Sequence, residues 1–269
     1  MTSPRQDFAL LSLRAVNLSF GGLKAVSDFR LDIHTGQIIS LIGPNGAGKT
    51  TVFNIVSGVY RADSGLIHLS RSDIGGLRPS KIAAMGLTRT FQNARLFKDL
   101  SVLDNVKIAF HLRHEYGLWG TIFRTRLYWQ DEQEVHQRTI ELLKVFDLEV
   151  RADESARNLP YGEQRKLEIA RALATKPLLL LLDEPAAGMN SQEKIDLMKT
   201  IRRIRDQFSL TILLIEHDMK LVMEISDRIT VMDHGVVIAE GTPFEIQKNP
   251  KVIEAYLGKD EEKNRYAAE

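Results

Sequence analysis

The segment Gly43-Pro44-Asn45-Gly46-Ala47-Gly48-Lys49-Thr50-Thr51 decides the fold. A mostly apolar stretch, Gln37–Ile42, precedes it and predicts a strand, and residues Thr50–Val59 after it are helix-like. This strand, loop and helix order is that of a phosphate-binding loop, whose glycines let backbone N–H groups converge on one point. We expect Lys49 to neutralise the β- and γ-phosphates of a nucleotide and Thr50 to offer an oxygen to Mg²⁺. A glycine-rich turn without a ligand would not explain why a lysine and two threonines open the helix.

Segments on both sides of this loop predict a mixed sheet. Leu11–Val16 and Val26–Ile33 alternate apolar and polar residues, as half-buried antiparallel strands do, and Gly21-Gly22 lies between them. Leu178–Leu182 and Thr211–Ile215 are short, continuous apolar runs, typical of parallel strands that are covered on both faces. Helical patterns lie between these runs, so we expect βαβ units and an antiparallel β edge.

The C-terminal third predicts a hairpin and then a helix. Arg228–Met232 and Val236–Ala239 flank the turn residues His234-Gly235, and a helix is expected over about Pro243–Leu257, before a charged tail. We therefore place one α/β domain at 11–258 and flexible termini at 1–10 and 259–269.

A helical subdomain interrupts this α/β core. Between Ser101 and Arg157 the strand signals vanish and apolar residues recur at helical spacing, so we expect an inserted helical subdomain at about 101–173. Within it, 113–129 combines arginines with aromatic residues, a mixture found in nucleic-acid-binding and membrane-surface segments. We favour packing of these aromatics within the subdomain or against a partner protein.

Composition excludes several classes of protein. The 269 residues are 43% hydrophobic, and 36 Lys and Arg balance 35 Asp and Glu, so no overall field attracts nucleic acid or anionic lipid. The absence of cysteine excludes disulfides and thiolate chemistry. The longest apolar run is far shorter than the roughly 20 residues of a transmembrane helix, and the N-terminus lacks a signal-peptide core. We expect a soluble, cytoplasmic chain that meets a membrane through a partner.

Two carboxylates follow the run Leu178–Leu182. Asp183 and Glu184 would lie at the carboxyl end of a buried strand, which is the ligand-binding edge of open α/β sheets. Asp183 would orient Mg²⁺ through its water shell, and Glu184 would polarise the water that attacks a γ-phosphate. Surface capping is the competing interpretation of this pair on its own. Together with the phosphate-binding loop, the pair predicts hydrolysis of a nucleotide.

The segment Leu159-Pro160-Tyr161-Gly162-Glu163-Gln164, inside Asn158–Leu173, narrows the class of hydrolase. It resembles the signature of the ABC ATPases and precedes the strand that bears Asp183, as in that family. The resemblance implies the P-loop NTPase fold of ABC ATPases, ATP and Mg²⁺ as ligands, and a signature that caps the γ-phosphate bound on an opposite subunit. An ordinary helix start is the competing interpretation of this segment alone.

The same resemblance assigns roles by position. Gln92, after Thr90-Phe91, stands in the place of the glutamine that contacts Mg²⁺ or the attacking water and signals to a permease. His217, after a strand, stands in the place of the histidine that hydrogen-bonds the γ-phosphate. Phe20 matches the aromatic that stacks on adenine, with Val26 beside it, although core packing would also explain Phe20.

Several stretches resemble the LivG-type ATPases of branched-chain amino acid importers: Thr88–Phe97, Asp183–Asn190, Ile215–Met219, Asn249-Pro250 and Ala255–Gly258. The resemblance implies a second ATPase chain, LivF-like or a copy of this one, and two permease subunits. A substrate-binding protein would take part indirectly, and this chain would lie at the cytoplasmic face of the plasma membrane. Importers of urea and short amides use close relatives. An exporter of the lipopolysaccharide type would share the ATPase chemistry.

Two residues depart from the family pattern. Pro160 stands where the signature usually has Ser, and Asn190 stands where the loop after the carboxylates usually has Asp. These departures concern the composite site that this signature completes on its partner. Translation and DNA-repair relatives fit less well, because the chain has one core and no sustained heptad tract. A non-hydrolysing sensor is disfavoured by Lys49, Asp183, Glu184 and His217.

Overall fold

The computed structural model describes residues 8–90, 96–111 and 126–256, and the side chains of 111–131 are not described. Within these ranges the strands are β1 Leu11–Phe20, β2 Leu23–Ile33, β3 Ile38–Ile42, β4 Ser64–Leu69, β5 Ser72–Asp73, β6 Leu87–Arg89, β7 Leu179–Asp183, β8 Thr211–Ile215, β9 Arg228–Asp233 and β10 Val236–Gly241. The α-helices are α1 Lys49–Val56, α2 Pro79–Ala84, α3 Val102–His111, α5 Arg126–Val145, α6 Tyr161–Ala174, α7 Ser191–Phe208, α8 Met219–Ile225 and α9 Pro243–Gln247. Short 3₁₀ turns lie at Glu149–Arg151 and Ala156–Asn158.

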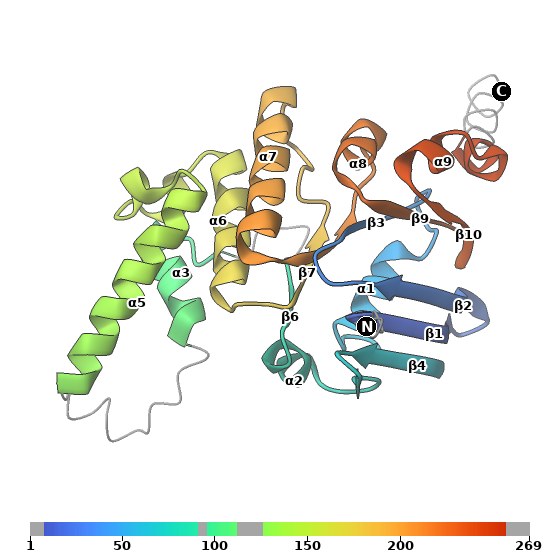
Figure 1. Cartoon of the computed structure of the whole chain (residues 1–269), viewed down its shortest axis with the longest axis horizontal. Helices are drawn as coiled ribbons and strands as arrows, with labels where there is room; N and C mark the ends of the chain where they lie inside the picture. The colour runs from blue at the N-terminus through green and yellow to red at the C-terminus, as the bar shows by residue number, and fades with distance from the viewer. Residues whose placement is uncertain (1–7, 91–95, 112–125, 257–269) are drawn as a thin grey trace, which may run out of the picture.

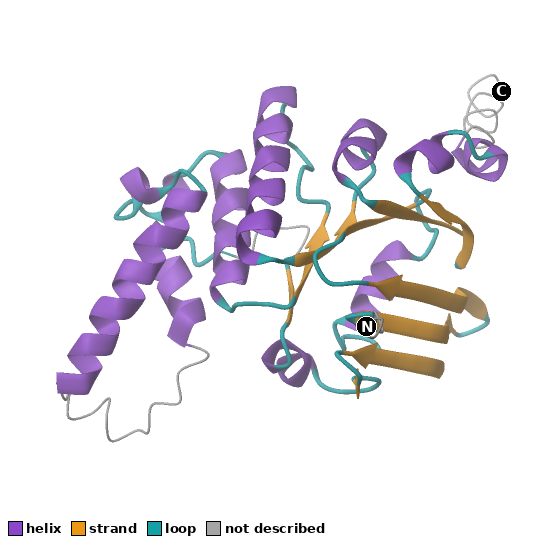
Figure 2. Cartoon of the chain, viewed as in Figure 1, coloured by secondary structure: helices purple, strands orange, loops and turns teal. Residues whose placement is uncertain are grey.

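Two sheets form the core. The larger has the order β10-β9-β3-β8-β7-β6, and all neighbours in it are parallel except the β9–β10 hairpin. The smaller sheet, β2-β1-β4-β5, is antiparallel. Figure 2 shows the two sheets in orange, with helices on the flanks of the larger one. The antiparallel edge and the parallel core that the sequence predicts are both confirmed.

The central strands are buried on both faces, which explains their continuous apolar runs. Along β7, Leu180 and Leu182 pack into a core with the helices α3, α5, α6 and α7. Leu179 and Leu181 point to the other core, which contains residues of α1 and the antiparallel sheet. Successive side chains on a strand face opposite sides, so one unbroken apolar run serves two layers.

The predicted helical insert corresponds to α3, α5 and α6, between β6 and β7 in the chain. Figure 1 shows these helices side by side at one side of the molecule, with β1, β2 and β4 at the opposite side. Most of the aromatic segment 113–129 lies outside the described residues, as do 1–7 and 257–269.

Two predicted boundaries are wrong in detail. Leu10 was assigned to a flexible terminus, yet it is buried and its N–H donates to the carbonyl of Ile33 at 2.7 Å. The expected single helix over 243–257 is two helices, α9 and 250–256. Pro250 explains the break, because proline disfavours the helical region for the residue before it and can occupy only the first turn of a new helix. The Asn249 side chain accepts the Lys251 N–H at 3.0 Å and caps that second helix.

Candidate functional site

The loop 43–48 links β3 to α1 and needs its glycines. Gly43, Gly46 and Gly48 have φ values of 147°, 84° and 100°, a region that residues with side chains rarely adopt. A Cβ on Gly48 would also lie 2.5 Å from the carbonyl oxygen of Ala25 in β2. The loop can therefore approach β2 only with glycine at position 48.

The Lys49 ammonium lies back over this loop. Its Nζ donates to the carbonyl oxygens of Gly43 at 2.7 Å and Pro44 at 2.9 Å, and the residue is 8% exposed. Helix α1 begins at Lys49, and its N-cap residue Gly48 makes no side-chain capping hydrogen bond. A buried cation and an uncapped helix N-terminus together make an anion site.

The turn of the β9–β10 hairpin supports the loop. The Gly235 N–H donates to the carbonyl of Ala47 at 3.0 Å, and the Gly235 carbonyl accepts the N–H of Ser27 at 2.8 Å.

Phe20 lies at the surface, 47% exposed, with its ring edge-on to Tyr60 at a centroid distance of 5.3 Å. Core packing therefore does not account for Phe20, whereas Val26 is buried. Stacking of Phe20 on adenine stays a prediction.

Asp183 ends β7 and is 6% exposed. Its Oδ2 accepts a charge-assisted hydrogen bond of 2.7 Å from Nη2 of Arg89, the last residue of the neighbouring strand β6. The other arm of the Arg89 guanidinium donates to Oδ1 of Asn54 in α1 at 2.7 Å. Arg89 therefore joins the carboxylate to the helix that begins at the phosphate-binding loop.

Glu184 follows with φ at 47°, in the left-handed region. Its N–H donates to the carbonyl of Ile215 at 2.9 Å, which ties the turn after β7 to the end of β8. A non-glycine residue in this region is strained, and such strain is concentrated at functional sites. The turn brings Glu184 Oε2 to 3.9 Å from Nδ1 of His217, which follows β8 and is exposed.

Glu216 directly precedes His217 and is 1% exposed. Its Oε1 accepts the N–H of Ala186 at 2.9 Å, and its Oε2 accepts the N–H of His217 at 3.2 Å. Burial raises the pKa of Glu216, and the N–H of Ala186 opposes that shift because it stabilises the carboxylate.

The signature segment packs against the turn that follows Glu184. A Cβ on Gly188 would lie 3.3 Å from the Tyr161 ring, and a Cβ on Gly162 would lie 3.0 Å from Oε1 of Glu193. Glu193 also forms a capping box with Asn190, whose Oδ1 accepts the N–H groups of Gln192 and Glu193 at 2.9 and 3.0 Å. Asn190 therefore caps α7.

Among the predicted site residues, Gln92 lies outside the described residues. Apart from Phe20 in β1 and Val26 in β2, the structure places the others in two groups: the loop, Asp183, Glu184 and His217 at the carboxyl ends of β3, β7 and β8, and the signature at the start of α6. Arg89 and Glu216 were missed. Glu216 had a signal in the sequence, because a Glu directly after an apolar strand repeats the arrangement of Asp183, whereas no strand was predicted around Arg89.

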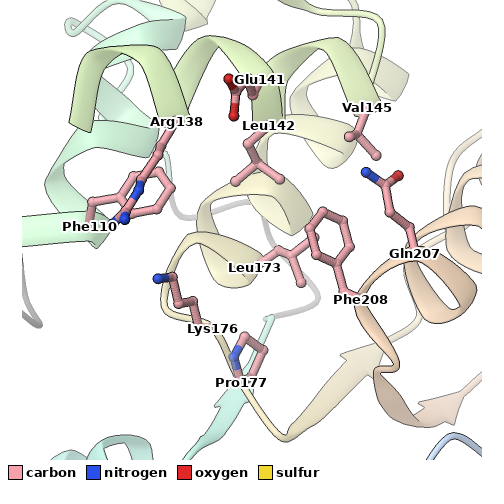
Figure 3. A pocket seen from close by; sticks show the side chains of 10 residues that line it. All are labelled: Phe110, Arg138, Glu141, Leu142, Val145, Leu173, Lys176, Pro177, Gln207 and Phe208. Carbon is pink, nitrogen blue, oxygen red and sulfur yellow. The ribbon is translucent and has the colours of Figure 1, made fainter. Parts of the chain in front are cut away.

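A pocket of about 500 Å³ lies between the helices α3, α5, α6 and α7. Figure 3 shows Arg138, Leu142 and Leu173 from α5 and α6 around it, with Phe208 at the end of α7 and Pro177 just before β7. Pro177 and Phe208 precede β7 and β8, so this pocket lies at the amino ends of the strands. Ligands of open α/β sheets bind at the carboxyl ends, where none of the described lining residues lies.

Comparison with known proteins agrees with this geometry. The model of the family described as ABC transporter matches residues 26–187. This chain is an ATP-binding protein of the ABC transporter family. A second model, described as branched-chain amino acid ATP-binding cassette transporter, matches residues 236–262 of this family member.

Relatives in the ABC family cover almost the whole chain. The high-affinity branched-chain amino acid transport ATP-binding protein BraF of Pseudomonas aeruginosa is 46% identical over 93% of this chain and 98% of its own length. The protein of the same description from Escherichia coli, LivG, is 47% identical over the same shares. A solved ABC cassette in its ADP conformation is 29% identical, with a TM-score of 0.81, over 93% of this chain and 99% of its own. The fold predicted from the sequence is thereby confirmed. No helix in the described part of the chain is long and apolar enough to cross a membrane.

Proposed function

We propose that this chain binds Mg-ATP and hydrolyses it to drive a branched-chain amino acid importer. One observation carries the proposal. The Lys49 loop, the Asp183 and Glu184 carboxylates and the His217 imidazole follow three neighbouring parallel strands, β3, β7 and β8, at their carboxyl ends. A phosphoryl-transfer site needs a phosphate cradle, a carboxylate that orients the metal and a group that polarises water, and these residues could supply all three.

The loop supplies the phosphate cradle. Lys49 can exchange its two hydrogen bonds to the loop carbonyls of Gly43 and Pro44 for phosphate oxygens at little cost, because its ammonium already lies at the loop. The N–H groups at the start of α1 add the positive end of the helix dipole. Phe20 supplies an exposed aromatic face for the adenine ring.

The residues present fit Mg²⁺. When bound, the ion would neutralise charge that develops on the phosphates. Oxygen donors are what it prefers, and it is commonly held by one or two protein oxygens together with substrate phosphates and water. Thr50 would give its hydroxyl, Asp183 would act through water, and Gln92 would complete the set. Among the described residues there is no group of three or more His, Cys, Asp or Glu side chains that could hold a metal alone.

Hydrolysis would use Glu184 and His217. Glu184 would accept a hydrogen bond from the attacking water, and His217 would donate a hydrogen bond to the γ-phosphate. The signature beginning at Pro160 would act on a nucleotide bound by another chain, because it starts a helix whose N-terminus can receive an anion. The functional unit would therefore be a pair of ATPase chains.

The cargo is inferred from the relatives. BraF and LivG are described as branched-chain amino acid transport proteins, and the C-terminal match at 236–262 belongs to the same class. We place this chain at the cytoplasmic face of the membrane with a LivF-like partner, two permease subunits and, indirectly, a substrate-binding protein. Nothing in the ATPase chemistry would touch the transported molecule.

A groove of about 400 Å³ is the surface to which we assign the permease contact. It lies between the end of β6 and the helices α3 and α6, and its lining includes Arg89, Ile108 and Arg171. Arg89 connects this groove to Asp183, so a permease segment seated here would be near a residue that contacts the metal-orienting carboxylate. Burial lowers the pKa of Arg171.

The test is to purify the chain with its partner ATPase, permeases and binding protein and to reconstitute them in vesicles. ATP-dependent uptake of leucine, isoleucine or valine is expected, with urea and a short amide as comparison cargoes. Uptake of urea alone, or export without import, would contradict the proposed cargo. ATP hydrolysis without any transport would contradict the coupling but not the ATPase.

The permease contact can be tested in the same preparation. Because the chain contains no cysteine, an Ile108→Cys variant has one thiol. A short bifunctional cross-linker should join it to a permease subunit. Phe208→Cys, at the pocket between the helices, is the control and should not cross-link. The reverse pattern would move the contact to that pocket.

A further inference from the structure

The ATPase site proposed above gives no role to the buried carboxylate of Glu216. Glu216 follows β8 directly, is 1% exposed, and its Oε2 lies 3.9 Å from Nδ1 of His217, which is also 3.9 Å from Oε2 of Glu184. Burying a carboxylate costs free energy, and the neighbouring Glu184 charge adds repulsion. An apolar residue at the end of this apolar strand would cost less free energy to bury, so stability alone does not account for Glu216.

Glu216 fixes the backbone on both sides of the reaction centre. Its two oxygens accept the N–H of Ala186, two residues after Glu184, and the N–H of His217. The carbonyl of Ile215, the preceding residue, accepts the N–H of Glu184 at 2.9 Å. The turn that carries Glu184 in its left-handed conformation is therefore held by consecutive residues of the β8 end. Loss of the carboxylate would release one of these links and leave the buried Ala186 N–H without its acceptor.

The same carboxylate also faces the imidazole. Nδ1 of His217 lies 3.9 Å from Oε2 of Glu216 and 3.9 Å from Oε2 of Glu184. These distances are too long for direct hydrogen bonds, so the two groups act on the ring through their charge. Nδ1 therefore faces the two carboxylates, and Nε2 lies on the opposite side of the ring, where it must carry a hydrogen to donate to a γ-phosphate oxygen.

We propose that Glu216 is a positioning residue of the ATPase site, which holds the Glu184 turn and sets the orientation of His217. The proposal rests on the proposed function, because it assigns Glu216 to the two groups that would carry hydrolysis. Glu216 itself touches neither nucleotide nor water in this scheme. If Glu216 only stabilised the fold, its replacement would change the free energy of unfolding but neither the hydrolysis rate nor the His217 signals.

The first experiment uses the isolated full-length chain and does not depend on hydrolysis. The protein is labelled with ¹⁵N-histidine, and the ring signals of His217 are identified among the seven histidines with a His217→Gln variant. The shifts of Nδ1 and Nε2 report the surroundings of each ring nitrogen. Glu216→Gln should change the His217 shifts, because it removes a carboxylate 3.9 Å from Nδ1. Identical His217 shifts in the two proteins would overturn the assignment of Glu216 to the His217 ring.

The second experiment measures hydrolysis in the assembled transporter. Glu216→Gln should lower the single-turnover rate by about 10-fold while the ATP dissociation constant changes less than about twofold, because alignment is lost and phosphate binding is not. Glu216→Ala should be slower still, since it also orphans the Ala186 N–H. A rate for Glu216→Gln within about twofold of wild type would overturn the positioning role.

Asp227→Asn is the matched control. Asp227 also accepts a backbone N–H from another element, that of Ile38 at 2.7 Å, but at the amino end of β3, away from the site. Its variant should change the melting temperature without changing the rate or the His217 signals. If Glu216→Gln behaves like Asp227→Asn, Glu216 is a structural link only. If Glu216→Gln changes the His217 shifts but wild type shows no hydrolysis with its partners, the proposed function fails and the assignment of Glu216 to the His217 ring stands.

Discussion

The guanidinium of Arg89 lies 2.7 Å from the carboxylate of Asp183, and the two side chains are only 7% and 8% exposed. The same guanidinium donates to Asn54 and Ser57 and stacks over the Phe53 ring, with its Cζ 5.4 Å from the ring centroid. One side chain therefore connects strand β6, Asp183 and helix α1. The arrangement makes Asp183 dependent on a residue 94 positions away in the sequence.

Replacing Arg89 with Met should destabilise the chain by about 3 to 5 kcal/mol, because the buried Asp183 carboxylate loses its cation. Arg89→Lys should recover part of the loss, since it keeps the charge but not the planar fork that reaches both Asp183 and Asn54. Urea unfolding of the isolated chain provides the measurement. The control is Arg14→Met, which breaks an exposed ion pair of the same 2.7 Å length, and should cost less than about 1 kcal/mol. Equal losses of unfolding free energy for the two Met variants would show that burial does not strengthen the contribution of the Arg89–Asp183 pair.

Glu184→Gln should keep Mg-ATP binding and slow hydrolysis by roughly 10²-fold or more, because the amide cannot accept a proton from the attacking water. ATP should then hold the paired ATPase chains together, which size-exclusion chromatography would detect. Steady-state hydrolysis by the assembled transporter within about twofold of wild type would contradict the role of Glu184. A variant of the partner chain's own glutamate, made in parallel, excludes turnover at the other site as the cause.

Lys49→Ala should weaken ATP binding at this chain's own site, because it removes the ammonium that lies over the loop. Calorimetry on the isolated chain gives the dissociation constant. Lys24→Ala, in the exposed part of β2, serves as the control for loss of one positive charge. An unchanged affinity for Lys49→Ala would mean that the loop does not bind phosphate.

Phe20→Ala should raise the ATP dissociation constant by the equivalent of about 1 to 3 kcal/mol, the usual contribution of stacking on a base. The ring is already exposed, so stability should change little. Phe20→Tyr should keep the affinity, because it preserves the aromatic face. A large loss of stability with normal affinity in the folded fraction would instead assign Phe20 to the packing against Tyr60.

Pro160→Ser should accelerate hydrolysis of the ATP that is held on the phosphate-binding loop of the partner chain. Pro160 precedes α6 and offers neither a backbone N–H nor a hydroxyl, both of which a signature serine can donate toward a γ-phosphate. We therefore expect two unequal ATP sites, the slower one closed by Pro160. Single-turnover hydrolysis after separate loss of Glu184 and of the partner's glutamate measures each site. Equal losses from the two, or no gain from Pro160→Ser, would count against the asymmetry.

Local patterns were enough to predict much of this fold. The expected strand Thr211–Ile215 coincides with β8, and the expected strand Gln37–Ile42 with β3 to within one residue. Strand burial and loop chemistry are local properties, since a continuous apolar run and a glycine-rich turn carry their own signals. The apolar pattern predicts the position of the C-terminal helical segment but not its division, which follows from the backbone restriction that Pro250 places on Asn249.

By itself, the sequence determined the phosphate-binding loop, the apolar strands and the positions of Asp183, Glu184 and His217 along the chain. Only the tertiary structure decided which strands are neighbours, and therefore that Arg89 pairs with Asp183 and that Glu216 accepts the N–H of Ala186, 30 residues away. The physical reason is that an apolar run fixes how a strand is buried but not its neighbours or its register. Contacts between side chains at strand ends depend on both, and they arise when β6, β7 and β8 assemble side by side.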